Sequence, residues 1–215
     1  MQKTSIAAAV LSLSCLPLIA AAAPSVMGHG KAGAAPAVAP DATCASNAGT
    51  DTFNAILSQN FETSFDAYDA QSADDFKVKK GKVCVAKGLS VTGQYFNGSG
   101  PARDVDVTFY KNASGHPGAV VKSYANLAYT NGPSFVVTFP SKAKLKGGVW
   151  VSPVANMDFG VGGEWGWEVQ SEINGAEGNW QNPGGGFGLC PTWDTITNCI
   201  GVTGDFMFSV NGKLK

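Results

Sequence analysis

Short segments in which apolar and polar residues alternate run through this chain, separated by glycine-containing turn sequences. Alternation with a period of two places the apolar side chains on one face of a β-strand. The run Val105-Asp-Val107-Thr-Phe109 shows the pattern most clearly. No long amphipathic segment is available to cross over a parallel sheet. The sequence therefore predicts an all-β fold, an antiparallel β-sandwich of the jelly-roll kind, with strands near 76–78, 89–95, 105–109, 119–129, 134–139, 148–154, 164–169 and 206–210.

One segment departs from this alternation. Phe53, Ile56 and Leu57 have the i, i+3, i+4 spacing of a helix. We therefore expect a short helical or irregular piece over residues 52–59.

The N-terminal region has the parts of a secretory signal peptide: a basic start, an apolar middle and an alanine-rich end. Cleavage after Ala22 fits the small-x-small rule. A transmembrane helix is the rival interpretation, but the apolar run is near the lower limit for spanning and no basic cluster follows it. We expect a signal peptide at 1–22, an Ala/Pro/Gly-rich flexible spacer at 23–43 and a β-sandwich domain at 44–215. The protein would be secreted, extracellular or periplasmic, with no integral membrane segment after cleavage.

Four cysteines remain after the signal peptide, at positions 44, 84, 190 and 199. An even number in an exported chain predicts two disulfides, for which three connectivities are possible. Cys44–Cys84 and Cys190–Cys199 are favoured because each pair is close in sequence. A zinc site is the competing use, but no pair has C-x₂-C spacing and the chain has only two histidines.

The charge balance bears on the choice of partner. The chain has 15 basic and 16 acidic residues, a net charge of −1, and Arg103 is its only arginine. This balance argues against broad electrostatic attraction to nucleic acid or to an anionic membrane as the main activity.

Several motifs together resemble a type of exported bacterial domain. They are Ala73-Asp-Asp-Phe76, Val91-Thr-Gly-Gln-Tyr-Phe-Asn97, Val107-Thr-Phe-Tyr110, Gly115-His-Pro-Gly118, Trp165-Gly-Trp167 and Trp180-Gln-Asn-Pro-Gly-Gly-Gly-Phe-Gly188. The type is a β-sandwich of unassigned role, found alone or beside catalytic and sorting domains in secreted bacterial proteins. The resemblance covers residues 66–211. It implies the fold and brings no known reaction with it.

No convincing catalytic set is present. Glu164, Glu168, Glu172 and Glu177 lie near the tryptophans, but on a strand the first two would be about 13 Å apart, too far for glycoside hydrolysis. His116 is the one histidine expected in the folded domain, in a turn that should project it into solvent. No Gly-x-Ser-x-Gly motif accompanies it.

The segment 180–193 is the most unusual in the chain: two tryptophans bracket a glycine run that follows Pro183, and Cys190 also lies within the segment. Glycine opens backbone conformations closed to other residues, and an indole face can stack on a sugar ring. Trp180, Gln181, Asn182 and Trp193 are therefore the predicted glycan contacts. Burial in a core is an equally weighted alternative for Trp180 and Trp193, and the favoured one for Trp165 and Trp167.

Aspartates supply a second candidate site. Asp74 and Asp75 open an expected strand, and Asp205 precedes the last strand, so the three would meet if those strands are neighbours. Carboxylate oxygens are the ligands that Ca²⁺ takes. The competing interpretation is that these side chains cap turns. The sequence suggests no cofactor other than a structural calcium ion at these aspartates.

These observations lead to one expected function and two alternatives. We expect a secreted or cell-surface, non-catalytic binding module whose partner is a glycan or a surface protein, and not nucleic acid. The alternatives are a structural or adhesion module without a small ligand, and a small secreted hydrolase.

Overall fold

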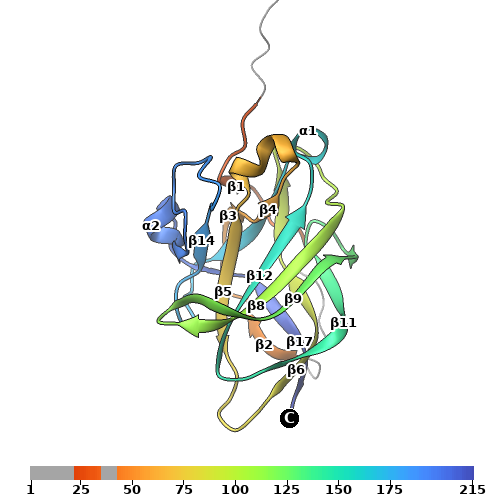
Figure 1. Ribbon diagram of the computed structural model, residues 1–215, viewed down its shortest axis with the longest axis vertical. Helices are drawn as coiled ribbons and strands as arrows, with labels where there is room; N and C mark the ends of the chain where they lie inside the picture. Colours follow the sequence, from red (N-terminus) through yellow and green to blue (C-terminus); the bar gives the residue numbers. More distant parts are fainter. Residues whose placement is uncertain (1–21, 35–42) are drawn as a thin grey trace, which may run out of the picture.

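The computed structural model describes residues 22–34 and 43–215, so the predicted signal peptide lies outside the described residues except for Ala22. Strands form most of the structure (Figure 1). They are β1 (Met27–His29), β2 (Thr43–Asn47), β3 (Asp51–Leu57), β4 (Gln59–Asn60), β5 (Gln71–Lys77), β6 (Cys84–Val91), β7 (Gly93–Phe96), β8 (Asp104–Ala113), β9 (His116–Leu127), β10 (Tyr129–Thr130), β11 (Val136–Leu145), β12 (Gly148–Asn156), β13 (Glu164–Gln170), β14 (Asn179–Gln181), β15 (Asp194–Thr195), β16 (Asp205–Phe206) and β17 (Phe208–Leu214). The helical pieces are short: a 3₁₀ helix (Thr63–Tyr68), α1 (Phe159–Gly162) and α2 (Ile196–Ile200).

The strands form three sheets. Sheet A has the order β1-β3-β13-β16, with β7 also paired to β13; sheet B has the order β10-β11-β6-β17-β2. Sheet C has the order β15-β14-β5-β12-β8-β9, with β4 paired to β12. Among the described strands every pairing is antiparallel except that of β4 with β12. The predicted all-β, antiparallel architecture is confirmed, and its sheets are arranged as in a sandwich.

The core lies between the sheets, and the alternating residues fill it. Val105, Val107 and Phe109 of β8 are all buried. Trp165 and Trp167 of β13 are also in the core, where they stack on Phe135 and Phe206 at ring distances of 4.6 Å. Each indole N–H donates to a backbone carbonyl. The rings are therefore buried without leaving their polar group unpaired.

Both predicted disulfides are present. Cys44–Cys84 joins β2 to β6 across β17, and Cys190–Cys199 closes a loop that contains β15. Structural disulfides persist in oxidising compartments, so this pairing indicates an extracytoplasmic environment.

The expected helical piece over 52–59 is wrong: residues 51–57 form β3. Phe53 has a positive φ of 60° and an exposed side chain, and the register with β13 shifts there. A bulge inserts an extra residue and interrupts the alternation of faces. Phe53 is therefore exposed while Ile56 and Leu57 are both buried, so the helix-like spacing of these three residues does not reflect a shared face.

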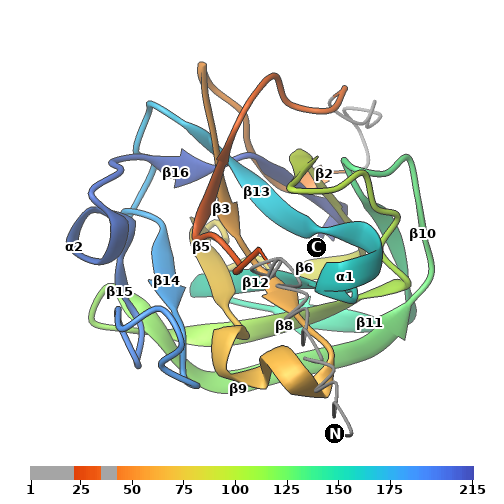
Figure 2. The ribbon, with the colours of Figure 1, turned by 90° about the horizontal axis from the view of Figure 1, so that it is seen from above.

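The expected spacer also needs correction in its described part. Residues 24–34, here called the N-terminal strap, lie on sheet A and include β1, which pairs with β3. Gly33 donates its N–H to Gly93 of β7. Since β3 and β7 flank β13, the strap passes over the outer face of β13 (Figure 2). A charge-poor, glycine-rich sequence here packs against a sheet because its glycines permit close approach.

Candidate functional site

The loop after β14 is held by one buried side chain, Asn182. Its Nδ2 donates to the carbonyls of Ala67 and Asp69, both at 2.8 Å, and its Oδ1 accepts from the N–H of Phe187. Gly184 lies so close to Ala67 that an added Cβ would be 2.7 Å from its backbone. Asn182 therefore shapes the loop and has no group free for a ligand, contrary to its predicted role.

Trp180 is a core residue rather than a sugar platform. It has no exposed surface, and its Nε1 donates to the carbonyl of Leu57 at 3.0 Å. β14 pairs with β5, so alternate side chains point to opposite faces of sheet C. Trp180 points inward, and its neighbour Gln181 is half-buried on the other face. The predicted contact through Trp180 is therefore wrong, and the core alternative is correct.

The other two predicted contacts reach the surface. Trp193 is half-buried and meets Tyr110 of β8 edge-on, with ring centroids 5.9 Å apart. Gln181 donates from its Nε2 to Oε1 of Gln71 on β5 at 2.9 Å. Trp193 lies inside the loop closed by Cys190–Cys199, which restrains its position. The surface around Trp193 thus combines two aromatic rings with side-chain amides.

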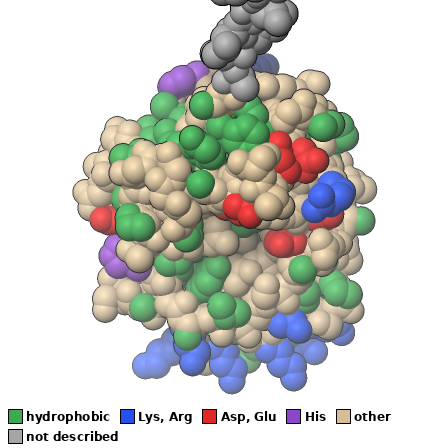
Figure 3. Space-filling model, turned by 45° about the horizontal axis from the view of Figure 1, so that its top comes forward, with side chains coloured by type: hydrophobic (Ala, Val, Ile, Leu, Met, Phe, Trp, Pro, Cys, Tyr) green, Lys and Arg blue, Asp and Glu red, His purple; other side chains and the backbone are tan. Residues whose placement is uncertain are grey.

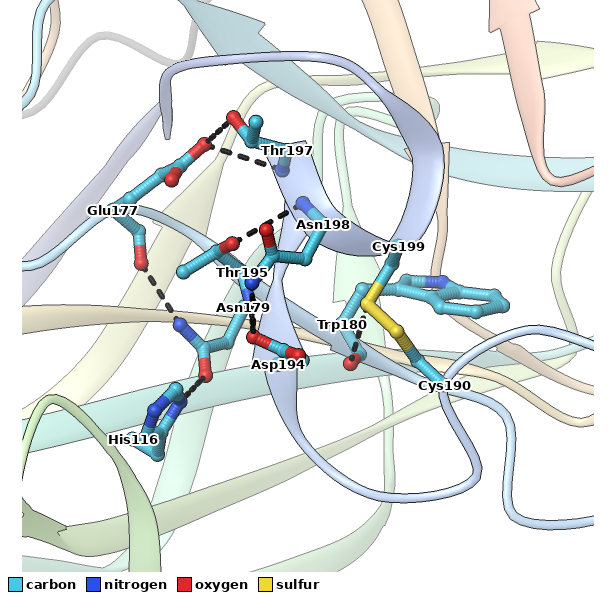
Figure 4. The surroundings of a disulfide bond; sticks show 10 residues. All are labelled: His116, Glu177, Asn179, Trp180, Cys190, Asp194, Thr195, Thr197, Asn198 and Cys199. Atoms are coloured by element: carbon cyan, nitrogen blue, oxygen red, sulfur yellow. Dashed lines mark hydrogen bonds between the residues drawn. A yellow bond between two sulfur atoms is a disulfide. The ribbon is translucent and has the colours of Figure 1, made fainter.

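A hydrogen-bonded network supports this surface (Figure 4). His116 contacts Oδ1 of Asn179 through its Nδ1 at 2.7 Å, and Asn179 donates to the carbonyl of Glu177. Asp194 accepts from Asn198 Nδ2 at 2.9 Å. The hydrogen bonds from Asn198 and from the Thr195 N–H lower the pKa of Asp194, so this carboxylate stays ionised.

His116 has a structural neighbour that the sequence did not reveal. It was expected in an exposed turn, but it is half-buried at the start of β9 and binds Asn179. An Asn partner orients the imidazole without activating a nucleophile. The groups described around Trp193 include aromatic rings and side-chain amides, which suit recognition of a polar ligand.

The structure brings two of the predicted calcium ligands together. Asn47 donates from one Nδ2 to Oδ2 of Asp74 at 3.1 Å and to Oδ2 of Asp205 at 3.3 Å. Both carboxyls are fully buried. Burial and the neighbouring Asp205 raise the pKa of Asp74 well above its usual value, and burial raises that of Asp205 to about 6.

Asp75 does not join this pair. It accepts from the N–H of Ala176, and the alternation of β5 places it on the face opposite Asp74. Within residues 22–34 and 43–215, no group of three or more His, Cys, Asp or Glu side chains is arranged to hold a metal ion. The predicted calcium set is not assembled, and its aspartates bind nearby N–H groups instead.

The carboxylates considered for hydrolysis are inaccessible or engaged. Glu164 and Glu168 on β13 have no exposed surface. Glu164 accepts from the N–H of Ser25 in the strap and from Asn97. Glu172 is exposed but bound to Thr50, and Glu177 is bound to Thr197. A glycoside hydrolase needs two carboxyl groups that face its substrate, and these four are buried or bound to neighbouring groups instead.

Two further findings complete the description. In the described ranges, none of the helices has both the length and the apolar character needed to cross a bilayer. No protein-family model, curated protein or solved structure matches this chain.

Proposed function

We propose that this chain is an exported, non-catalytic module that binds a glycan at the surface formed by Trp193, Tyr110, Gln181 and Gln71. The observation that carries the proposal is the half-exposed Trp193, held beside Tyr110 by a disulfide-closed loop. An indole offers a large apolar face at a low entropic cost when it is held in place. The two disulfides support export, as does the signal peptide expected from the sequence.

The polar groups around Trp193 suit hydroxyl-rich ligands. Gln181 and Gln71 present amide donors and acceptors, and Asp194 presents an ionised carboxylate. Binding sites for small polar ligands commonly combine an aromatic wall with a few such groups. A glycan fits this set better than a protein helix or strand, because the groups beside the aromatic rings are polar and β15 is only two residues long.

The test is electrophoresis of the protein from residue 23 onward, with disulfides intact, through gels that contain individual soluble polysaccharides. We expect retardation by at least one polymer. Trp193→Ala should weaken binding about tenfold, since one aromatic contact contributes on the order of 1 kcal/mol. An arm with EDTA tests for calcium.

Leu189→Ala is the matched control. Leu189 is apolar and 37% exposed like a surface contact residue, but it lies immediately before the loop closed by Cys190–Cys199, outside the segment that holds Trp193. Its replacement should leave retardation unchanged. If no polysaccharide retards the parent protein, or if both variants behave like it, the glycan proposal is wrong and a structural or adhesion module becomes the better description.

A further inference from the structure

Lysines are concentrated at the end of the molecule where the chain terminates. Eight exposed lysines line two hollows there, which the structure forms from the β5–β6 connection, the end of β11 and the C-terminus (Figure 1). In Figure 3 the basic side chains gather along the lower edge of the molecule. The eight are Lys77, Lys79, Lys80, Lys82, Lys142, Lys144, Lys146 and Lys215. We call this surface the lysine end.

The fold spaces these charges regularly. Lys142 and Lys144 alternate along β11 with Ala143 and Leu145, which are buried, and Lys146 directly follows the strand. Lysines on one face of a strand therefore recur about every 7 Å. Across the sheet, Val85 of β6 pairs with Lys144 on one side and with Lys213 of β17 on the other. Two strand spacings put Lys144 and Lys213 about 10 Å apart.

The two hollows are adjacent. One has a volume of about 470 Å³ and the other of about 460 Å³, and Lys146 and Val83 line both. A ligand that follows them meets lysines along its whole path. This shape favours an extended chain over a compact anion.

No acidic side chain in the described part of the chain forms an ion pair with these lysines. No acidic side chain lines either hollow. The one ion pair in the described ranges is Arg103–Asp104, which includes none of these lysines. A net charge of −1 therefore conceals a strongly positive surface. Like charges held together repel, and an anion that binds there relieves the repulsion.

We propose that the lysine end binds an anionic polysaccharide, a linear polymer with carboxylate groups on its sugars. Lysine presents point charges on flexible stems and suits groups spaced along such a chain. Half-buried Val83 and Val85 lie between the lysines and can contact the C–H faces of sugar rings. This site is separate from Trp193, which lies in the loop beside α2 and β14, and it does not depend on that proposal.

Two other polyanions fit the surface less well. Single-stranded nucleic acid is held by stacking on aromatic rings, and no aromatic residue lines the hollows. Membrane binding by a basic surface is strengthened by inserted apolar groups, and Leu214 is the one large apolar side chain exposed on β6, β11 and β17 of the described chain.

The test measures binding to polygalacturonate, with neutral dextran as the control polymer, over a series of salt concentrations. Lys144→Gln/Lys146→Gln should weaken binding about tenfold and flatten its salt dependence. Lys31→Gln/Lys111→Gln removes the same charge from exposed lysines elsewhere and should change binding by less than about twofold. Lys79→Gln/Lys80→Gln, in the β5–β6 connection, provides a second test if the first variant fails to fold.

The other arms distinguish the alternatives. Trp193→Ala should leave polygalacturonate binding intact, which separates this site from the proposed glycan surface. Tighter binding to an oligothymidylate, or to vesicles that contain phosphatidylglycerol, would overturn the choice of polymer. Equal losses in the two double variants, or no binding to polygalacturonate, would overturn the site itself.

Discussion

Glu168 is an unusual carboxyl because it is fully buried and neither of its oxygens accepts a hydrogen bond within the described chain. It lies on the outer face of β13, opposite the core-facing Trp167. Burial, followed by the nearby Asp51 carboxyl, raises its pKa from 4.5 to about 9. Glu168 is therefore protonated at neutral pH, and ionising it costs folding stability.

The expected consequence is a stability that falls as the pH rises. A group with a raised pKa in the folded state stabilises the fold below its unfolded pKa of 4.5, and this stabilisation is lost as the pH rises through about 9. Glu164, with a pKa of about 7, contributes in the lower part of this window. Between pH 7 and 9 the free energy of unfolding should decrease by up to about 1.4 kcal/mol per pH unit.

Glu168→Gln should reduce that slope, since an amide does not titrate, and the part that remains belongs to Glu164 and to the buried Asp74. Denaturant unfolding at several pH values between 7 and 9 measures it. Glu172→Gln is the control: its carboxyl is exposed, and hydrogen bonds from Thr50 lower its pKa, so this change should not alter the slope in the window. An undiminished slope in Glu168→Gln would contradict the assignment of the proton to this residue.

At the scale of elements, the N-terminal strap depends on close backbone contacts. Val26 accepts from the N–H of Leu57 on β3, and Ser25 donates to Glu164 on β13. Gly28 pairs with Ala55 and lies against Phe96: an added Cβ would be 2.5 Å from that ring. Only glycine fits this position, because any side chain would collide with the ring of Phe96. The strap can therefore pack this closely on sheet A only with glycine at position 28.

Gly28→Val should displace the strap from sheet A, because the ring of Phe96 and the valine side chain cannot both be accommodated. Two observables follow: the amide hydrogen of Leu57 should exchange faster, and trypsin should cleave after Lys31, which lies in the strap. Gly160→Ala is the control, since a Cβ there meets nothing within 4 Å. Equal trypsin sensitivity of the two variants would show that the strap is not clamped at Gly28.

What the sequence could predict follows from the length of each element. β8 alternates over ten residues and β12 carries a largely apolar run over nine, long enough for either pattern to show, and both strands were expected. β1, β4, β15 and β16 have two or three residues, too few for a period of two to be recognised. The burial of Trp180 could not be predicted for the same reason. β14 has only three residues, and its pairing with β5 decides which of its side chains point inward. Which indole is buried thus depends on a partner far away in the sequence.

At the scale of the whole molecule, the net charge of the sequence does not reveal how the charges are distributed over the surface. The alternation Lys142-Ala-Lys144-Leu-Lys146 is visible in the sequence. Its convergence with the β5–β6 connection and the C-terminus follows only from the strand order β11-β6-β17. A balanced composition excludes a strong overall field, but it does not exclude a strong local one.

The two disulfides are expected to have different roles: Cys44–Cys84 mainly stabilises the whole molecule, and Cys190–Cys199 mainly fixes the surface loop that contains Trp193. Cys44–Cys84 spans 40 residues and links strands of sheet B, whereas Cys190–Cys199 spans nine and closes one loop. Loop-closure entropy grows with the length of chain enclosed. The paired substitution Cys44→Ser/Cys84→Ser should therefore cost about 4 kcal/mol of unfolding free energy, and Cys190→Ser/Cys199→Ser about 2.5 kcal/mol.

The functional effects should run in the opposite order. Trp193 lies inside the shorter loop, so opening Cys190–Cys199 frees its indole and adds the entropy of ordering it to the cost of binding. Cys44 and Cys84 are in sheet B and touch neither Trp193 nor Tyr110. Denaturant unfolding and gel retardation of both double variants compare the two quantities. The shorter bridge should matter more for glycan retardation and the longer one for stability; if both properties changed together, Trp193 would not owe its placement to the loop.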